Sequence, residues 1–261
     1  MTLGIIKVSI RFCIIILFLS FITKVYSSQA NYAQKKNGDC ADLSFNEIDL
    51  IEVNVKKNKK FTKKIIRSVL KQAIYPKDKK NFKSEIIFYN KDELPCKIVS
   101  KLRINGDYAD HVAIEKGNPI SSMNIKLIKS NMGGIVSFKL YIPRTRNYFN
   151  EIFITTFLRN IGLLAPRTKI VNVKFNGSYH SMILQENIVK EFLENNHLTE
   201  SFIFEGDDKN IQSRLGGNPS IQRLAKITNS QIAIKNNDML DYAFISLSEL
   251  NQIYLKNNFA I

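Results

Sequence analysis

The sequence predicts an α+β fold with a mainly antiparallel sheet, one helix packed on that sheet, and helical flanks at both ends of the chain. Ile135–Pro143 alternates apolar and polar residues, which is the pattern of a half-buried strand. Asn150–Ile161 places its apolar residues at helical spacing and stops at Gly162, so it predicts a helix. Asn176-Gly177, between two alternating segments, favours a tight hairpin turn. Strand, helix and hairpin in close succession indicate one folded unit.

The other elements follow from the same patterns. Lys169–Phe175 and Ser178–Gln185 are the two strands of the hairpin, and Ile188–Asn195 has a short helix pattern. Asn131–Gly134 contains a Gly-Gly pair that could cradle a phosphate, but a hairpin turn explains the pair more simply. Upstream, Phe61–Ile74 has one apolar helical face. The upstream strand patterns are Leu50–Val55, Glu85–Tyr89, Cys96–Ile104 and Met123–Lys129.

The composition is that of a folded chain with a strong positive charge. The 261 residues are 44% hydrophobic, which is ample for a core, and the net charge is +15. Between Lys56 and Lys83 there are twelve basic residues and one acid, Asp78. This segment is either a docking surface for anionic lipid or anionic glycan, or a solvated basic helix and linker. Nucleic acid is not an expected partner, because no stacking platform or binding motif accompanies the charge.

The N-terminus has the pattern of an export signal. Lys7 and Arg11 precede the apolar run Phe12–Ile22, and the residues before Ser28 suit signal-peptidase cleavage. The alternatives are a retained anchor over Ile10–Tyr26 and a cytosolic protein with a buried N-terminal helix. The export pattern predicts an exported or inner-membrane-anchored chain in the periplasm or another extracytoplasmic compartment.

Cysteine usage depends on that prediction. Cys13 lies inside the apolar run, so Cys40 and Cys96 are the only thiols that remain after cleavage. In an exported domain these two cysteines either form a disulfide or stay free. The three histidines and the scattered cysteines have no metal-ligand spacing.

The stretch from Cys96 onward resembles the CotH family of spore-coat protein kinases, a set of secreted atypical kinases, and looks most like a bacterial branch of it. The resemblance extends over about 110 residues and depends on the order of short motifs. The motifs are Leu102-Arg103-Ile104-Asn105-Gly106-Asp107, the strands Met123–Ile128 and Gly134–Ile142, Asn150-Glu151-Ile152, Ile161-Gly162-Leu163-Leu164-Ala165-Pro166-Arg167, Val171–Gly177, Ile183–Glu186 and Lys190-Glu191-Phe192-Leu193-Glu194. It implies a sheet and helix like those of a protein-kinase N-terminal lobe, residues 85–208, after a signal or anchor (1–27) and a basic segment (28–84), and before a helical segment (209–261).

The resemblance also implies ATP and magnesium as ligands, with a strand lysine on the phosphates and a helix carboxylate that holds the lysine. Lys139 and Glu151 are the first choice for this pair, and Lys126 is the second choice for the lysine. A surface lysine and a helix-start carboxylate are the plainer interpretations. Gln185–Asn187 would be the hinge that receives the adenine, with Glu186 at the family's carboxylate position.

Two further groups have weaker support. Arg103 could contact phosphate or form a structural ion pair. Asp207 and Asp208 could bind a metal, although adjacent loop acids are more often only solvated.

The family's catalytic aspartates have no counterpart in the sequence. In the family they lie well downstream of the hinge, one of them in a Trp-Asp segment, and this chain has no tryptophan. Beyond Asp208 only a polar connector and two helix-like stretches, Ile221–Ile227 and Asp238–Asn257, are expected. We therefore expect a kinase relative that keeps the nucleotide-binding part but is inactive alone. The alternative is a non-catalytic cell-envelope module that binds anionic glycan or lipid.

Overall fold

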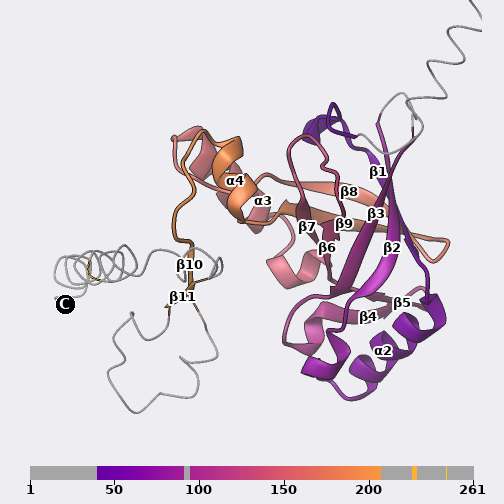
Figure 1. Cartoon of the computed structure of the whole chain (residues 1–261). Coiled ribbons are helices and arrows are strands. Elements are labelled where there is room, and N and C mark those ends of the chain that lie inside the picture. The colour runs from indigo at the N-terminus through magenta and orange to yellow at the C-terminus, as the bar shows by residue number, and fades with distance from the viewer. Residues whose placement is uncertain (1–39, 91–94, 207–224, 228–244, 246–261) are drawn as a thin grey trace, which may run out of the picture.

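A seven-stranded closed barrel forms the body of the protein (Figure 1). The computed structural model describes residues 40–90, 95–206, 225–227 and 245. Around the barrel the strands follow the order β1-β2-β3-β6-β7-β9-β8. Their bounds are β1 Leu50–Val55, β2 Phe82–Tyr89, β3 Pro95–Ile104, β6 Met123–Leu127, β7 Ser137–Tyr141, β8 Thr168–Phe175 and β9 Ser178–Glu186.

Smaller elements surround the barrel. The α-helices are α2 Asn58–Leu70, α3 Asn150–Asn160 and α4 Lys190–Asn195. Two short sheets pair β4 Val112–Glu115 with β5 Asn118–Ser121, and β10 Phe204–Gly206 with β11 Ala225–Ile227. Single 3-10 turns occur at η1 Phe45–Glu47, η2 Pro76–Asp78, η3 Ala109–His111 and η4 Pro143–Arg146.

The predicted fold class is wrong. An antiparallel sheet of the kinase N-lobe type with helical flanks was expected, whereas the structure is mostly β and its sheet closes on itself. β1 makes the closure, because it pairs antiparallel with β2 on one side and parallel with β8 on the other, with Leu50 opposite Asn172. Closure leaves none of these seven strands with a free edge.

The helical flanks are wrong as well. α2 lies between β1 and β2 in the sequence and covers an end of the barrel instead of flanking it. Ile221–Ile227 was expected to be helical, but Ala225–Ile227 is a strand paired with β10. The export segment before residue 28, Asp207 and Asp208 lie outside the described residues, and so does the helix expected at Asp238–Asn257 except for Ile245.

Several individual elements are confirmed. β7 and α3 occupy the expected strand and helix, and α3 begins at Asn150. Asn176 and Gly177 have φ of 52° and 83°, which is the left-handed backbone of a two-residue hairpin turn, and β8 and β9 pair directly across it. β6 pairs antiparallel with β7, so the Asn131–Gly134 segment is the connection of a hairpin. The alternating sequence patterns therefore located the strands, although not their closure.

Inward-facing side chains fill the barrel. Along β3 every second residue is buried, from Ile98 to Ile104. α2 closes one end, where its buried Phe61 lies edge-on to Phe82 and Phe175, with ring centroids 5.1 and 6.0 Å apart. The interior of the barrel is thus a core packed with side chains.

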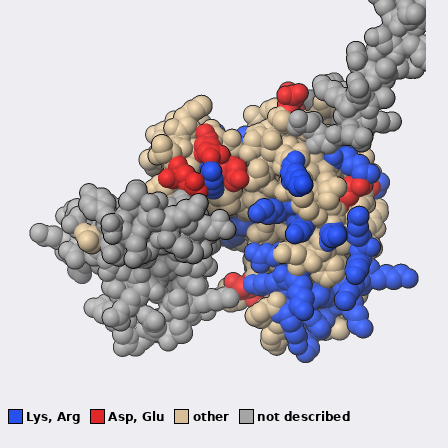
Figure 2. All heavy atoms as spheres, viewed as in Figure 1, with Lys and Arg blue, Asp and Glu red and all other residues tan. Residues whose placement is uncertain are grey.

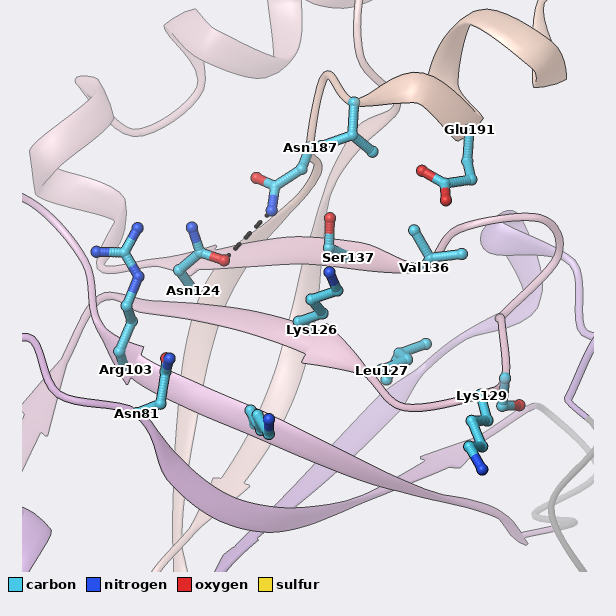
Figure 3. Close-up of a pocket in the computed structure, with 13 residues that line it drawn as sticks. Asn81, Arg103, Asn124, Lys126, Leu127, Lys129, Val136, Ser137, Asn187 and Glu191 are labelled. Atoms are coloured by element: carbon cyan, nitrogen blue, oxygen red, sulfur yellow. Dashed lines mark hydrogen bonds between the residues drawn. The ribbon is translucent and has the colours of Figure 1, made fainter. Parts of the chain in front are cut away.

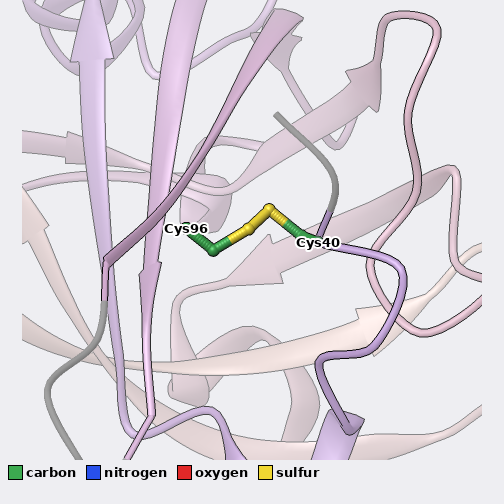
Figure 4. The surroundings of a disulfide bond; sticks show 2 residues. All are labelled: Cys40 and Cys96. Atoms are coloured by element: carbon green, nitrogen blue, oxygen red, sulfur yellow. A yellow bond between two sulfur atoms is a disulfide. The ribbon is translucent and has the colours of Figure 1, made fainter. Parts of the chain in front are cut away.

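A disulfide joins Cys40 to Cys96 at the start of β3 (Figure 4). The two Cα atoms are 5.8 Å apart, which suits a bridge, and Cys40 is buried. The pairing settles the alternative that the sequence left open, in favour of the bridge. By closing a long loop, such a bond stabilises a domain by about 2–4 kcal/mol.

Candidate functional site

Three lysines stand side by side on the outer face of the barrel. In the sheet register Lys83 of β2 is opposite Lys101 of β3, and Lys101 is opposite Lys126 of β6. Neighbouring strands lie about 4.8 Å apart, so these three residues, the lysine row, form a line of positive charge across the strands. Directly opposite like charges destabilise a sheet. The lysine row therefore lowers the stability of the sheet slightly, and the packing of the barrel does not need charged residues at these positions.

Across the described part of the chain, no carboxylate lies within 4.0 Å of a lysine-row amine. Elsewhere on β2 and β3, side chains of opposite charge do form an ion pair, since Lys97 Nζ is 2.8 Å from Glu85 Oε1. The unneutralised row is consequently a local feature of β2, β3 and β6.

A second row runs parallel to the first. Arg103 of β3 is opposite Asn124 of β6, Asn124 is opposite Lys139 of β7, and Lys139 is opposite Gln185 of β9. Side chains two residues apart on a strand share a face, so both rows lie on the same outer surface. Together they place cations next to uncharged hydrogen-bonding groups.

A cleft of about 520 Å³ opens over part of these rows, at Lys101 and Lys126 of the first and at Arg103 and Asn124 of the second (Figure 3). The α4 side of the cleft is formed by Asn187, Val189 and Glu191. Asn187 Nδ2 donates a hydrogen bond to Asn124 Oδ1 at 3.3 Å, and the Asn187 N–H donates to the Ser137 carbonyl at 3.1 Å. The whole lining is Asn81, Lys101, Arg103, Asn124, Lys126, Leu127, Lys129, Ser130, Val136, Ser137, Asn187, Val189 and Glu191.

The cleft is electropositive and of ligand size. Its lining includes four cationic side chains and one carboxylate, Glu191. A volume of about 520 Å³ falls within the usual 300–1,000 Å³ of small-molecule sites. Asn124, Ser137 and Asn187 add amide and hydroxyl groups that can donate or accept hydrogen bonds. A multiply charged anion with polar substituents fits this surface chemically.

Two of the residues proposed from the sequence, Arg103 and Lys126, line the cleft. Three others meet beside it. Gln185 Nε2 donates to Glu151 Oε1 at 2.6 Å, and Gln185 is the register partner of Lys139. Glu151 is thus held by Gln185, and within the described ranges Lys139 and Glu151 make no ion pair with each other. Lys139 Nζ instead lies 5.9 Å from the Tyr141 ring centroid.

Glu186 lies on the opposite face of β9. It is the register partner of the core residue Phe138 and is 3% exposed. Arg167 donates two hydrogen bonds to its carboxylate, at 2.8 and 2.9 Å. The carboxylate is therefore held in an ion pair inside the barrel wall, and Asn187, the next residue, is the one that lines the cleft.

Sequence reasoning missed Lys101, Asn124, Ser137 and Lys129 as site residues. Lys101 carried a usable signal, because it lies two residues before Arg103 on the same predicted strand and so shares its face. Asn124 and Ser137 carried none, because their roles depend on which strands pair.

The described residues contain no group of three or more histidine, cysteine or acidic side chains that could hold a metal ion. Within the same residues no helix is long and apolar enough to cross a membrane. No protein-family model matches the chain, and no curated protein matches it. The resemblance to the CotH family therefore stays a prediction.

Proposed function

We propose that this chain is a CotH-like kinase relative that binds a nucleoside polyphosphate, such as ATP with magnesium, in the cleft and does not transfer phosphate by itself. The observation that carries the proposal is the cleft's lining, in which four cations face one carboxylate. Phosphate groups are recognised by charge-assisted hydrogen bonds from lysine and arginine. Arg103, Lys101 and Lys126 supply these groups from adjacent strands.

The polar part of the lining supports a nucleotide rather than a bare phosphate. Asn187, Asn124 and Ser137 can hydrogen-bond a base or a ribose, while Val136 and Val189 offer apolar contact. A magnesium ion would be held mainly by the phosphates, with Glu191 as the nearest carboxylate of the lining. The ion would neutralise phosphate charge.

The proposal stops at binding. Phosphoryl transfer needs a catalytic aspartate and a metal-binding aspartate facing the nucleotide. In the described part of the chain the cleft lining contains no aspartate. Glu151, the acid proposed as the partner of Lys139, accepts a hydrogen bond from Gln185.

Thermal unfolding with and without magnesium-ATP tests the proposal. A ligand at 100 times its Kd stabilises the folded state by about 2.7 kcal/mol, which raises Tm measurably. We expect the shift to weaken in high salt, because the contacts are ionic. A folded protein whose Tm is unmoved by millimolar magnesium-ATP at low salt would contradict nucleotide binding.

Neutralising variants localise the site. Lys126→Gln should weaken magnesium-ATP binding about tenfold or more, because a hydrogen bond to a charged group contributes about 1.5–3 kcal/mol. Lys116→Gln is the matched control, since Lys116 is exposed at the β4–β5 turn and outside the cleft. Equal Kd values for the two variants by titration calorimetry would show that the nucleotide binds elsewhere.

A further inference from the structure

The outward face of α2 combines lysines with exposed apolar side chains. Lys59, Lys63, Ile66 and Leu70 follow one another at spacings of four, three and four, so they form one stripe along the helix. Leu70 is 78% exposed and Ile66 is 37% exposed. The opposite face of the helix, with Phe61, is buried in the barrel end. α2 therefore keeps an apolar stripe on its outer side that the fold does not cover.

The turn after the helix extends this surface. Tyr75 is 42% exposed, and Lys71 Nζ and Lys77 Nζ lie 5.8 and 5.5 Å from its ring centroid. A half-exposed tyrosine ring with two lysine amines near it is an amphipathic arrangement. Such side chains sit with their rings at the boundary between lipid headgroups and acyl chains.

Within Lys56–Lys83 no acid is exposed, and Asp107, from outside the segment, pairs with Lys79. Asp78, the one acid between Lys56 and Lys83, is fully buried and ion-paired with Arg67 and Lys64. Figure 2 shows lysine and arginine side chains gathered at the end of the molecule where Figure 1 places α2. Crowding is evident at Lys64, where burial and then the neighbouring cations, Arg67 first, lower its pKa.

We propose that the α2 end of the barrel docks on a bilayer that contains anionic lipid, with the lysines on the headgroups and Ile66, Leu70 and Tyr75 in the interface. A soluble polyanion would need only the lysines, and it would leave Leu70 in water. A bilayer suits both the lysines and the apolar side chains, because its surface is negative and its acyl boundary takes up apolar side chains. The apolar stripe thus favours lipid over anionic polysaccharide.

The absence of tryptophan in the sequence provides a local reporter. Leu70→Trp places one indole on the proposed contact surface of the full chain. We expect its emission to shift to shorter wavelength when vesicles containing phosphatidylglycerol are added, and to be quenched by brominated lipid. Phosphatidylcholine vesicles should give a much smaller change, and added salt should reduce the change.

Phe153→Trp is the matched control, because Phe153 is 70% exposed on α3, which Figure 1 places away from α2. Its emission should not move, even where another segment of the chain tethers the protein to the vesicle. An unshifted Leu70→Trp emission would overturn the proposal, and so would equal shifts at the two positions. Binding to dextran sulfate without any lipid-induced shift at Leu70→Trp would also overturn it, in favour of a polysaccharide.

The charged part of the surface has its own test. Lys63→Gln should weaken the apparent affinity for phosphatidylglycerol vesicles about fivefold, the contribution of one lysine near an anionic membrane surface. Lys190→Gln removes the same charge from α4 and should leave the affinity unchanged. Equal losses would mean that net charge alone drives the association and would reject α2 as the docking surface.

Discussion

The inner and outer faces of β2 and β3 differ in whether their polar and charged side chains have partners within the fold. On the inner face Ser84 and Ser100 are opposite each other and share a hydrogen bond of 2.7 Å, so even the polar pair there is satisfied. One residue away on each strand, Lys83 and Lys101 are opposite each other on the outer face, with like charges and, among the described residues, no carboxylate within 4.0 Å of either amine. The polar pair on the inner face is satisfied by the fold itself, whereas the charges of the lysine pair on the outer face are not neutralised by it.

The difference between the two faces indicates that a ligand binds on the outer face, where the charges are not neutralised. Sheets tolerate like-charged opposite pairs at a cost of a fraction of a kcal/mol, and β2 and β3 pair opposite charges elsewhere, at Glu85 and Lys97. An anion bound over the lysine row would remove that cost. Changes to the inner face should therefore alter stability, and changes to the outer face should alter binding.

The largest effect is expected inside the barrel. Phe138→Ala removes a fully buried ring on β7 and should lower the free energy of unfolding by about 3–5 kcal/mol, measured by urea denaturation. Val99→Ala is the outward comparison, since Val99 is 53% exposed on β3 and should change stability by about 0.5 kcal/mol. Similar losses for the two variants would mean that the two faces do not differ in packing.

The next effect concerns Glu186, on the inner face of β9. Glu186→Gln leaves Arg167 without its carboxylate and should destabilise the protein by about 2–3 kcal/mol. The cost falls below that of a wholly buried pair, because Arg167 is 24% exposed. Magnesium-ATP affinity, measured by calorimetry on the folded variant, should stay unchanged, because this side chain does not line the cleft. Reduced affinity with unaltered stability would reverse the assignment.

The sequence predicted the elements better than their assembly. Alternation located β7 and the β8–β9 hairpin, because each is a local pattern of side chains. The pairing of β1 with β8 joins residues more than 100 positions apart, and nothing in Leu50–Val55 specifies that partner. Barrel closure thus depended on long-range pairing that a single sequence does not record.

For the candidate site as well, the sequence predicted what depends on a single strand and missed what depends on the pairing of strands. Arg103 and Lys126 were candidates as strand cations, and their place in the cleft needed only the strand pattern. Gln185 and Glu186 were candidates together, yet alternation puts them on opposite faces of β9, so only one of the two can share the outer face. Asn187 lines the cleft because β9 ends just before it.

The smallest effect is the sharpest test of the comparison, because stability and binding should move in opposite directions. Lys101→Glu places an acid between Lys83 and Lys126 and should raise the free energy of unfolding by about 0.2–1 kcal/mol, as opposite charges replace like ones across the strands. The same change should weaken magnesium-ATP binding more than tenfold, because the cleft loses a cation and gains an anion. Lys101→Gln should fall between the wild type and Lys101→Glu in both measurements, by urea denaturation and calorimetry. A less stable Lys101→Glu variant with unchanged affinity would show that the lysine row serves the fold rather than a ligand.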